Sequence, residues 1–257
     1  MIFDCHTHTK FSADSKMTAA DAIAKAESLN LGVVFTEHFD YDLPGEIDFT
    51  FDPEKYMDEY KNFRSEKIFL GAEIGLRKSA RAANENFIGR VNFDMIIGSI
   101  HVVDDFDIYL PDFYVGKDKA TAYRKYFAAM AEETAVEDFD VLGHIDYICR
   151  AAPYDDPEID YKTFKPEIDK VLKIIVERKK ILELNTRRLD KVRALKELVP
   201  IYRSYKNFGG RFITIGSDAH RAEAVGANFD AAINFAKELD LIPVTFRERK
   251  MITSQNF

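Results

Sequence analysis

Short apolar runs recur along the whole 257-residue chain, and longer helix-like segments separate them. The runs are rich in Ile, Val, Phe and Leu, and they lack a strict alternation of apolar and polar positions. This pattern is typical of parallel strands that are buried on both faces. We therefore predict seven strands, at residues 2–6, 33–36, 68–74, 94–100, 139–143, 181–185 and 211–216.

The segments between these runs have helical periodicity and recognisable ends. In the clearest segment a Thr18–Asp21 capping pattern precedes the apolar positions, and Asn30 and Gly32 follow them. The predicted helices span residues 18–29, 119–136, 163–179 and 190–207. An alternation of strands and helices that continues along the chain predicts an α/β fold with parallel strands and crossover helices.

Two segments and the tail lack this pattern. Residues 40–60 and 102–118 are aromatic, acidic and irregular, with Pro44, Pro53 and Pro111, so we predict loops over the strand ends. The tail 241–257 contains Val-Thr-Phe and predicts a small terminal strand. Because no composition shift marks a boundary, residues 1–257 are expected to form a single domain.

Charge and cysteine content narrow the class of protein. A formal net charge of −8 argues against a general nucleic-acid binder, which needs a basic surface. No apolar run approaches the roughly 20 residues of a membrane helix, and no signal peptide is expected before the first strand. Two cysteines, Cys5 and Cys149, cannot form a disulfide framework. We expect inert core thiols, with Cys5 pointing away from His6, and a cytoplasmic protein.

All six histidines stand at the end of an apolar run, and most have an acid within two residues. Imidazole is the commonest metal ligand near neutral pH, and neighbouring carboxylates suit zinc, manganese or iron. In parallel barrels the C-terminal strand ends carry the active site. The placement therefore predicts a polynuclear metal centre at one mouth of a barrel. The candidate motifs are Asp4-Cys5-His6-Thr7-His8, Thr36-Glu37-His38, Gly71-Ala72-Glu73, Gly98-Ser99-Ile100-His101, Gly143-His144 and Gly216-Ser217-Asp218-Ala219-His220.

This ordered series resembles the polymerase-and-histidinol-phosphatase (PHP) superfamily, whose fold is a distorted seven-stranded (β/α)7 TIM-like barrel. Within the superfamily, several segments resemble the monofunctional histidinol-phosphate phosphatases. They are HTHTKFSADS, the Gly-x-Glu-Ile-Gly-Leu segment at 71–76, Leu-Glu-Leu-Asn-Thr at 182–186 and residues 209–220.

The resemblance implies three divalent metal ions, which could be zinc, iron or manganese. Asp14 departs from relatives that have histidine at that position, so the identity of the third metal is more open. Glu37 and Asp4 are expected to orient ligands from outside the ligand set. Glu73, Asp218 and His220 are the expected catalytic residues. The implied ligands are His6, His8, Glu73 and Asp218 for the first ion, Glu73, His101 and His144 for the second, and Asp14, His38 and His220 for the third.

The implied activity is hydrolysis of L-histidinol phosphate to L-histidinol and phosphate in histidine biosynthesis, through a hydroxide held between two metals. Arg150 and Arg188 are candidate phosphate ligands, since a guanidinium matches phosphate bidentately. Two alternatives remain open: another small phosphate ester or nucleotide as substrate, and a non-catalytic metal-binding regulatory domain. The expected partner is a small phosphate ester, with no nucleic acid and no membrane, and the oligomeric state is left open.

Acids and aromatics in the two loop segments suggest a vestibule that suits a cationic amine and a flat ring. They are Asp40, Asp42, Asp104, Asp105 and Asp107, with Phe39, Tyr41, Phe106 and Tyr109.

Overall fold

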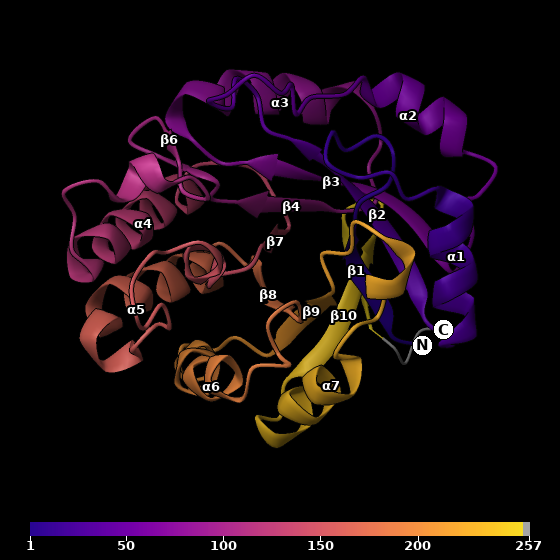
Figure 1. Ribbon diagram of the computed structural model, residues 1–257. Coiled ribbons are helices and arrows are strands. Elements are labelled where there is room, and N and C mark those ends of the chain that lie inside the picture. Colours follow the sequence, from indigo (N-terminus) through magenta and orange to yellow (C-terminus); the bar gives the residue numbers. More distant parts are fainter. Residues whose placement is uncertain (254–257) are drawn as a thin grey trace.

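The computed structural model describes residues 1–253 and shows a ring of strands surrounded by helices (Figure 1). Neighbouring barrel strands are parallel, in the order β1-β2-β3-β4-β7-β8-β9. This arrangement confirms the predicted barrel and its seven strands within the described residues. The strands are β1 (Phe3–Thr7), β2 (Gly32–Phe39), β3 (Ile68–Gly75), β4 (Ile96–Ser99), β7 (Val141–Leu142), β8 (Ile181–Asn185) and β9 (Phe212–Gly216).

The barrel closes between β1 and the residues that follow β9. The amide of Asp218 donates to the carbonyl of His6 at 2.8 Å, and the amide of His8 donates to the carbonyl of Ala219 at 2.8 Å. Thr7 and Ala219 form the corresponding parallel bridge. Closure is therefore made by the same short segments that carry candidate ligands.

The predicted helices are confirmed with small shifts at their ends. Thr18 accepts a hydrogen bond from the Asp21 amide at 3.1 Å, as the capping pattern predicts. The prediction that residues 40–60 form only a loop is wrong, because α2 occupies the end of that segment. Its apolar positions are aromatic tyrosines, which masked the helical period. The helices are α1 (Ala19–Ser28), α2 (Pro53–Tyr60), α3 (Arg81–Arg90), α4 (Lys119–Thr134), α5 (Tyr161–Glu177), α6 (Val192–Asn207) and α7 (Phe229–Glu238).

Short elements fill the remaining connections. Within residues 102–118, β5 (Val102–Val103) and β6 (Phe106–Asp107) form a small antiparallel hairpin, which is followed by the 3-10 turn η2 (Pro111–Tyr114). Three further 3-10 turns are η1 (Lys78–Ala80), η3 (Tyr147–Arg150) and η4 (Ala222–Ala224). No helix of the described chain is long and apolar enough to cross a membrane.

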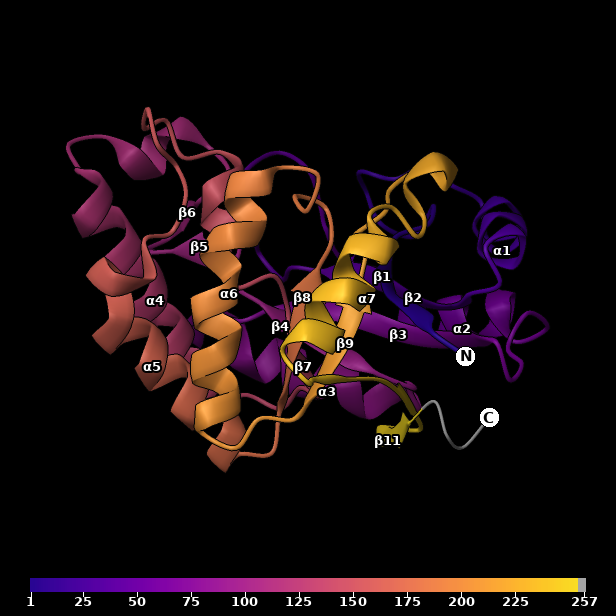
Figure 2. The same ribbon diagram turned by 90° about the horizontal axis from the view of Figure 1, so that it is seen from below.

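The terminal strand predicted in 241–257 is present as β10 (Ile242–Arg247), followed by antiparallel β11 (Lys250–Thr253), while residues 254–257 lie outside the described chain. Figure 2 shows β11 at one end of the barrel. Val244 and Phe246 pack there on a buried apolar cluster that includes Cys5 and Phe69. Cys5 thus points away from the mouth, and burial raises the pKa of its thiol, like that of Cys149, to about 12.

Candidate metal centre

The C-terminal ends of five barrel strands bring all six histidines to one mouth. His6 and His38 are the second-last residues of β1 and β2, and the other histidines lie just beyond strand ends. Glu73 comes from β3 between them and is fully buried. All nine predicted ligands therefore lie in one cluster, although they are spread over more than 200 residues of sequence.

The first group of ligand atoms surrounds a space large enough for an ion. Glu73 Oε2 lies 3.2 Å from His6 Nε2 and 3.5 Å from His8 Nε2. Asp218 Oδ1 lies 3.9 Å and 3.5 Å from the same two nitrogens. A tetrahedral ion with bonds of about 2.0–2.2 Å would hold its ligand atoms roughly 3.3–3.6 Å apart. The Nε2 atoms of His6 and His8 and Oε2 of Glu73 are buried without a hydrogen-bond partner, so this group fits a cation.

The second group shares Glu73 through its other oxygen. Glu73 Oε1 lies 2.8 Å from His144 Nε2 and 3.5 Å from His101 Nε2. The two imidazole nitrogens lie 3.5 Å apart. Ser99 donates to the same carboxylate oxygen at 2.6 Å and fixes its rotamer. One carboxylate therefore faces both groups of ligand atoms, and its Oε2 also lies 3.0 Å from His38 Nδ1.

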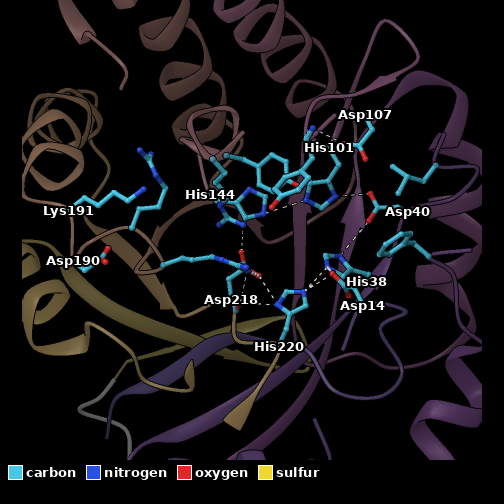
Figure 3. A pocket seen from close by; sticks show the side chains of 17 residues that line it. Asp14, His38, Asp40, His101, Asp107, His144, Asp190, Lys191, Asp218 and His220 are labelled. Carbon is cyan, nitrogen blue, oxygen red and sulfur yellow. Dashed lines mark hydrogen bonds and ion pairs between the residues drawn. The ribbon is translucent and has the colours of Figure 1, made fainter. Parts of the chain in front are cut away.

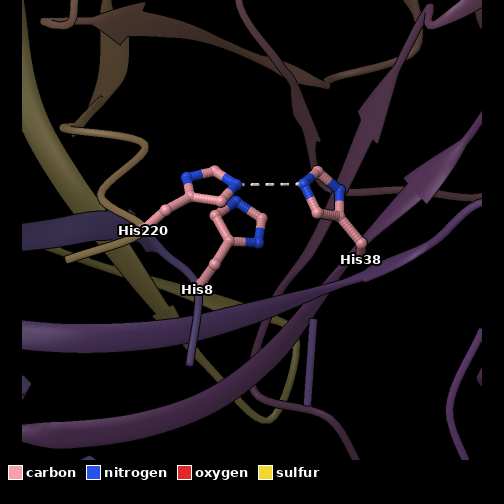
Figure 4. A group of neighbouring side chains, drawn as sticks. All are labelled: His8, His38 and His220. Atoms are coloured by element: carbon pink, nitrogen blue, oxygen red, sulfur yellow. Dashed lines mark hydrogen bonds between the residues drawn. The ribbon is translucent and has the colours of Figure 1, made fainter. Parts of the chain in front are cut away.

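The third group is the more exposed one. Asp14 Oδ2 lies 3.0 Å from His220 Nε2 and 3.7 Å from His38 Nε2, and the two imidazole nitrogens lie 3.3 Å apart. Figure 4 shows the rings of His38 and His220 facing each other beside His8. The Asp14 side chain is 41% exposed, whereas that of Glu73 is fully buried. Asp14 therefore gives this group an oxygen ligand in a partly solvated place.

Glu37 and Asp4, which we expected outside the ligand set, contact no ligand ring directly. Glu37 accepts hydrogen bonds from Thr9 and from the hydroxyl of Ser12 at 2.7 Å, and that hydroxyl lies 3.1 Å from His8 Nδ1. Glu37 thus reaches His8 through Ser12. Asp4 accepts from the Ser217 amide at 2.8 Å and holds the loop that carries Asp218.

Two carboxylates that touch ligand rings were not recognised from the sequence. Glu183 Oε1 lies 2.6 Å from His6 Nδ1, and Asp40 Oδ1 lies 2.8 Å from His101 Nδ1. Glu183 stands in the Leu-Glu-Leu-Asn-Thr segment as a lone acid in a buried strand, which is the signal that identified Glu73. Asp40 follows β2 directly, but its position in an acidic segment made it look like a loop residue.

The cluster combines ionised carboxylates with imidazoles that carry protons in the absence of metal, and metal ions would replace these protons. Burial disfavours the Glu73 carboxylate, but His6, His101 and His38 outweigh burial and hold its pKa well below the usual value. The pKa of His101 is raised to about 10, because Asp40 and Glu73 overcome the effect of burial. By contrast, burial and the neighbouring imidazoles hold the pKa of His8 well below its usual value. Metal binding to such a cluster releases protons.

A cavity of about 570 Å³ opens above the cluster (Figure 3). Arg150 lines it, contacts Asp218 Oδ2 at 2.5 Å and lies over the ring of Tyr147. Arg188 also lines it, but this side chain is held by Asp146 at 2.7 Å and by Glu158. Both predicted arginines therefore reach the cavity, and Arg150 is the one in contact with the cluster.

A further arginine, Arg187, was not a candidate. It lines the cavity, is half exposed and lies 3.6 Å from Asp218 Oδ1.

The predicted vestibule is only partly formed. Among its acids, Asp107 and Asp40 line the cavity, and Asp40 is buried against His38 and His101 instead of facing solvent. Phe39 belongs to the core, where its ring stacks on Phe87. The remaining members except Tyr109 lie outside the cavity lining. Tyr147, which the vestibule set did not include, is present.

The fold and the site together define an α/β barrel whose histidine- and carboxylate-lined mouth can hold several metal ions. Comparison with known proteins agrees. The model of the PHP domain matches residues 4–187. A probable histidinol-phosphatase of Clostridium acetobutylicum is 42% identical over 252 residues, which cover 98% of this chain and 99% of that protein. A histidinol-phosphatase of Lactococcus lactis subsp. lactis is 32% identical, over 86% of this chain and 84% of that protein.

A solved structure is similar over nearly the whole chain. The crystal structure of histidinol phosphate phosphatase from Lactococcus lactis, complexed with zinc, L-histidinol and phosphate, has a TM-score of 0.91 and 29% identity. The alignment covers 98% of this chain and 99% of that one. The chain therefore belongs to the PHP family, in its histidinol-phosphatase branch.

Proposed function

We propose that this chain is a metal-dependent phosphatase that hydrolyses L-histidinol phosphate to L-histidinol and phosphate, as a step of histidine biosynthesis. The observation that carries the proposal is the position of Glu73. Its two carboxylate oxygens face two different groups of imidazole nitrogens at 2.8–3.5 Å beneath an open cavity. A carboxylate placed in this way suits a centre of two neighbouring ions that act on one phosphate group.

Three divalent transition metal ions fit the three groups of ligand atoms. Zinc, iron and manganese are all compatible with imidazole and carboxylate ligands. When bound, they would supply Lewis acidity that activates water near neutral pH and offsets phosphoryl charge. The residues proposed to hold them are His6, His8, Glu73 and Asp218 for the first ion, Glu73, His101 and His144 for the second, and Asp14, His38 and His220 for the third.

The side chains around the cavity supply binding and proton handling. The guanidinium of Arg150 faces the cavity beside Asp218, so it can hold phosphoryl oxygens bidentately. Arg188 is proposed to help from the cavity wall, while its two carboxylate partners hold it in place. Asp218, buried beside Arg150, is proposed to accept the proton of the attacking water through Oδ2. His220 lies at the cavity surface, so it would hold the third ion on the side from which the leaving group departs.

The substrate chemistry fits the rest of the cavity. Asp107 is half-buried at its wall and can pair with the substrate amine. Tyr109 and Tyr147 offer aromatic faces for the imidazole. We further propose that residues 1–257 act as one domain in the cytoplasm on this small molecule, without nucleic acid. The buried, unpaired thiols and the net charge of −8 support that setting.

The experiment is steady-state hydrolysis of L-histidinol phosphate beside p-nitrophenyl phosphate and a nucleoside monophosphate, with metal content measured on the same preparation. We expect more than one metal ion per chain and the highest kcat/KM for histidinol phosphate. Equal kcat/KM for all substrates would leave a general phosphatase, and an active preparation without metal would overturn the metal centre.

A matched pair of arginine variants tests the phosphate site. Arg150→Ala should lower kcat/KM for every phosphate ester, because it removes the bidentate contact. Arg124→Ala should not, since this half-exposed arginine pairs with Glu167 on the helical surface.

A further inference from the structure

Glu183 is a fully buried carboxylate on β8 that touches two of the proposed metal ligands at once. One oxygen, Oε1, lies 2.6 Å from Nδ1 of the His6 ring. The other, Oε2, accepts the backbone amide of His144 at 2.7 Å and the side-chain amide of Asn185 at 3.2 Å. His6 belongs to the first group of ligand atoms and His144 to the second. The two groups are therefore connected at Glu183 as well as at Glu73.

This contact requires the carboxylate to cross β9, which lies between β8 and β1. Gly216 stands at the crossing point, in register with Asn185 of β8. A Cβ atom at Gly216 would lie 2.4 Å from Glu183 Oε1 and 2.4 Å from His6 Cβ. Both distances are far below van der Waals contact, so the absence of a side chain at Gly216 makes the contact possible.

The chemistry of the contact is that of a histidine whose outer nitrogen is held by an acid. A carboxylate that accepts from Nδ1–H fixes the tautomer, turns the ring and raises the basicity of Nε2. In His6 this Nε2 is buried without a hydrogen-bond partner and lies 3.2 Å from Glu73 Oε2. On the other side, the held amide of His144 fixes the backbone from which its ring reaches Glu73 Oε1 at 2.8 Å.

We propose that Glu183 is a positioning residue that orients His6 and His144 together, so that the first and second ion sites depend on one carboxylate seated over Gly216. The third group, formed by Asp14, His38 and His220, has no contact with Glu183. It meets the first group through His38 Nδ1, 3.0 Å from Glu73 Oε2, and His220 Nδ1, 3.6 Å from Asp218 Oδ1, so we expect its ion to be nearly unaffected by Glu183. This inference rests on the proposed metal centre, and its test separates the two.

The test is a titration of metal-free protein with Zn²⁺ in competition with a chromophoric chelator, for the wild type and Glu183→Gln. Glutamine has the size of glutamate and one acceptor oxygen. It carries no negative charge, so it cannot accept from both His6 Nδ1 and the His144 amide as the carboxylate does. We expect the affinities of two of the three ions to fall roughly 10–100-fold, in the range of lost partners of metal-bound histidines, while the third affinity is nearly unchanged. Glu137→Gln is the control, because Glu137 is also a buried glutamate but contacts no ligand.

Gly216→Ala tests the same inference with the carboxylate kept. The added methyl group would meet Glu183 Oε1 and also His6 Cβ, so the loss at two ions that we expect supports the role of Glu183 only where Glu183→Gln shows the same loss. Gly89→Ala is its control, since a Cβ there meets no heavy atom within 4 Å. Thermal unfolding of each metal-free variant checks that the fold is retained.

The outcomes are distinct. Wild-type protein that binds no Zn²⁺ would overturn the proposed metal centre. Wild-type protein that binds three ions, with Glu183→Gln and Gly216→Ala binding them as tightly, would overturn the role of Glu183 and leave the centre intact. An equal loss at all three ions would also contradict it, because it would indicate a general disturbance of the mouth.

Discussion

The two ends of the barrel bury side chains of opposite kinds. The mouth buries imidazoles and carboxylates, several of whose atoms have no hydrogen-bond partner, among them His6 Nε2, His8 Nε2 and Glu73 Oε2. The base buries the apolar cluster that β10 covers with Val244 and Phe246. Burial of apolar surface stabilises a fold, whereas buried polar atoms without partners cost free energy. The comparison indicates that the base contributes stability and that the mouth depends on a cation.

Ion pairs and hydrogen bonds also fix the edge of the base. Arg249, in the turn between β10 and β11, contacts Asp140 at 2.9 Å and Asp138 at 2.8 Å. The amides of Glu248 and Arg249 donate to Asp94 at 3.0 and 2.8 Å. The terminal hairpin is thus fixed across the barrel base without any ligand. Variants at the base should therefore change stability without changing activity.

The largest effect is expected at Glu73. Glu73→Gln removes the carboxylate shared by two groups of ligand atoms, so turnover should fall roughly 1,000-fold or more, a barrier change of about 4 kcal/mol. The metal-free variant should unfold at a lower denaturant concentration, because the imidazoles that hold the Glu73 pKa well below its usual value lose their carboxylate partner. Metal analysis, kinetics and urea unfolding check this. Glu37 reaches His8 only through Ser12, so turnover of Glu37→Gln should fall by only about 10–100-fold. Near-normal turnover and metal content in Glu73→Gln would contradict the shared role.

The opposite outcome is expected at the base. Phe246→Ala should lower the free energy of unfolding by about 3 kcal/mol, because it removes a buried ring and leaves a cavity. Metal content and kcat/KM should stay at wild-type values below the unfolding transition. Met251→Ala, on the more exposed strand of the same hairpin, is the control. A loss of metal in folded Phe246→Ala would break the separation between the two ends.

The sequence predicted the strands and the histidines at their ends from local patterns, whereas the full ligand set, Asp14 included, came from the resemblance to a family and stays a prediction. Apolar runs marked the barrel strands, and a histidine or acid at each run's end marked the mouth. It did not predict Glu183 as a partner of His6, because that contact crosses β9 and depends on the space at Gly216. Nor did it predict α2, whose buried positions include Tyr56 and Tyr60 in a segment with loop-like composition. What sequence reasoning missed was set by packing between distant segments.

Another buried glutamate, Glu137, lies outside the metal centre, and the pH dependence of unfolding tests its contribution to stability. In Glu137, burial and the neighbouring Glu133 outweigh Asn84 and Arg81 and raise the carboxyl pKa to about 7 from 4.5. Because the folded-state pKa is the higher one, this group's contribution to stability is present below pH 4.5 and lost as the pH rises to about 7. At pH 8 the free energy of unfolding of Glu137→Gln, measured with urea, should therefore exceed that of the wild type by roughly 1–2 kcal/mol. At pH 4.5 the two free energies should differ little. An equal gain at both pH values would mean that ionisation of Glu137 is not the cause.

The smallest effect is expected at the wall of the cavity, where a residue touches the substrate but not the metals. Asp107 is half-buried there, accepts the Tyr109 amide at 2.7 Å, and can reach an amine in the cavity. Asp107→Asn should raise KM for L-histidinol phosphate roughly 5–20-fold, about 1–2 kcal/mol for a charge-assisted contact, and leave kcat and metal content nearly unchanged. KM for p-nitrophenyl phosphate, which has no amine, should not change. Asp104→Asn is the control, because Asp104 pairs with Lys125 outside the cavity. Equal changes in KM for both substrates would mean that Asp107 shapes the cavity without pairing with the amine, so discrimination would arise elsewhere in the mouth.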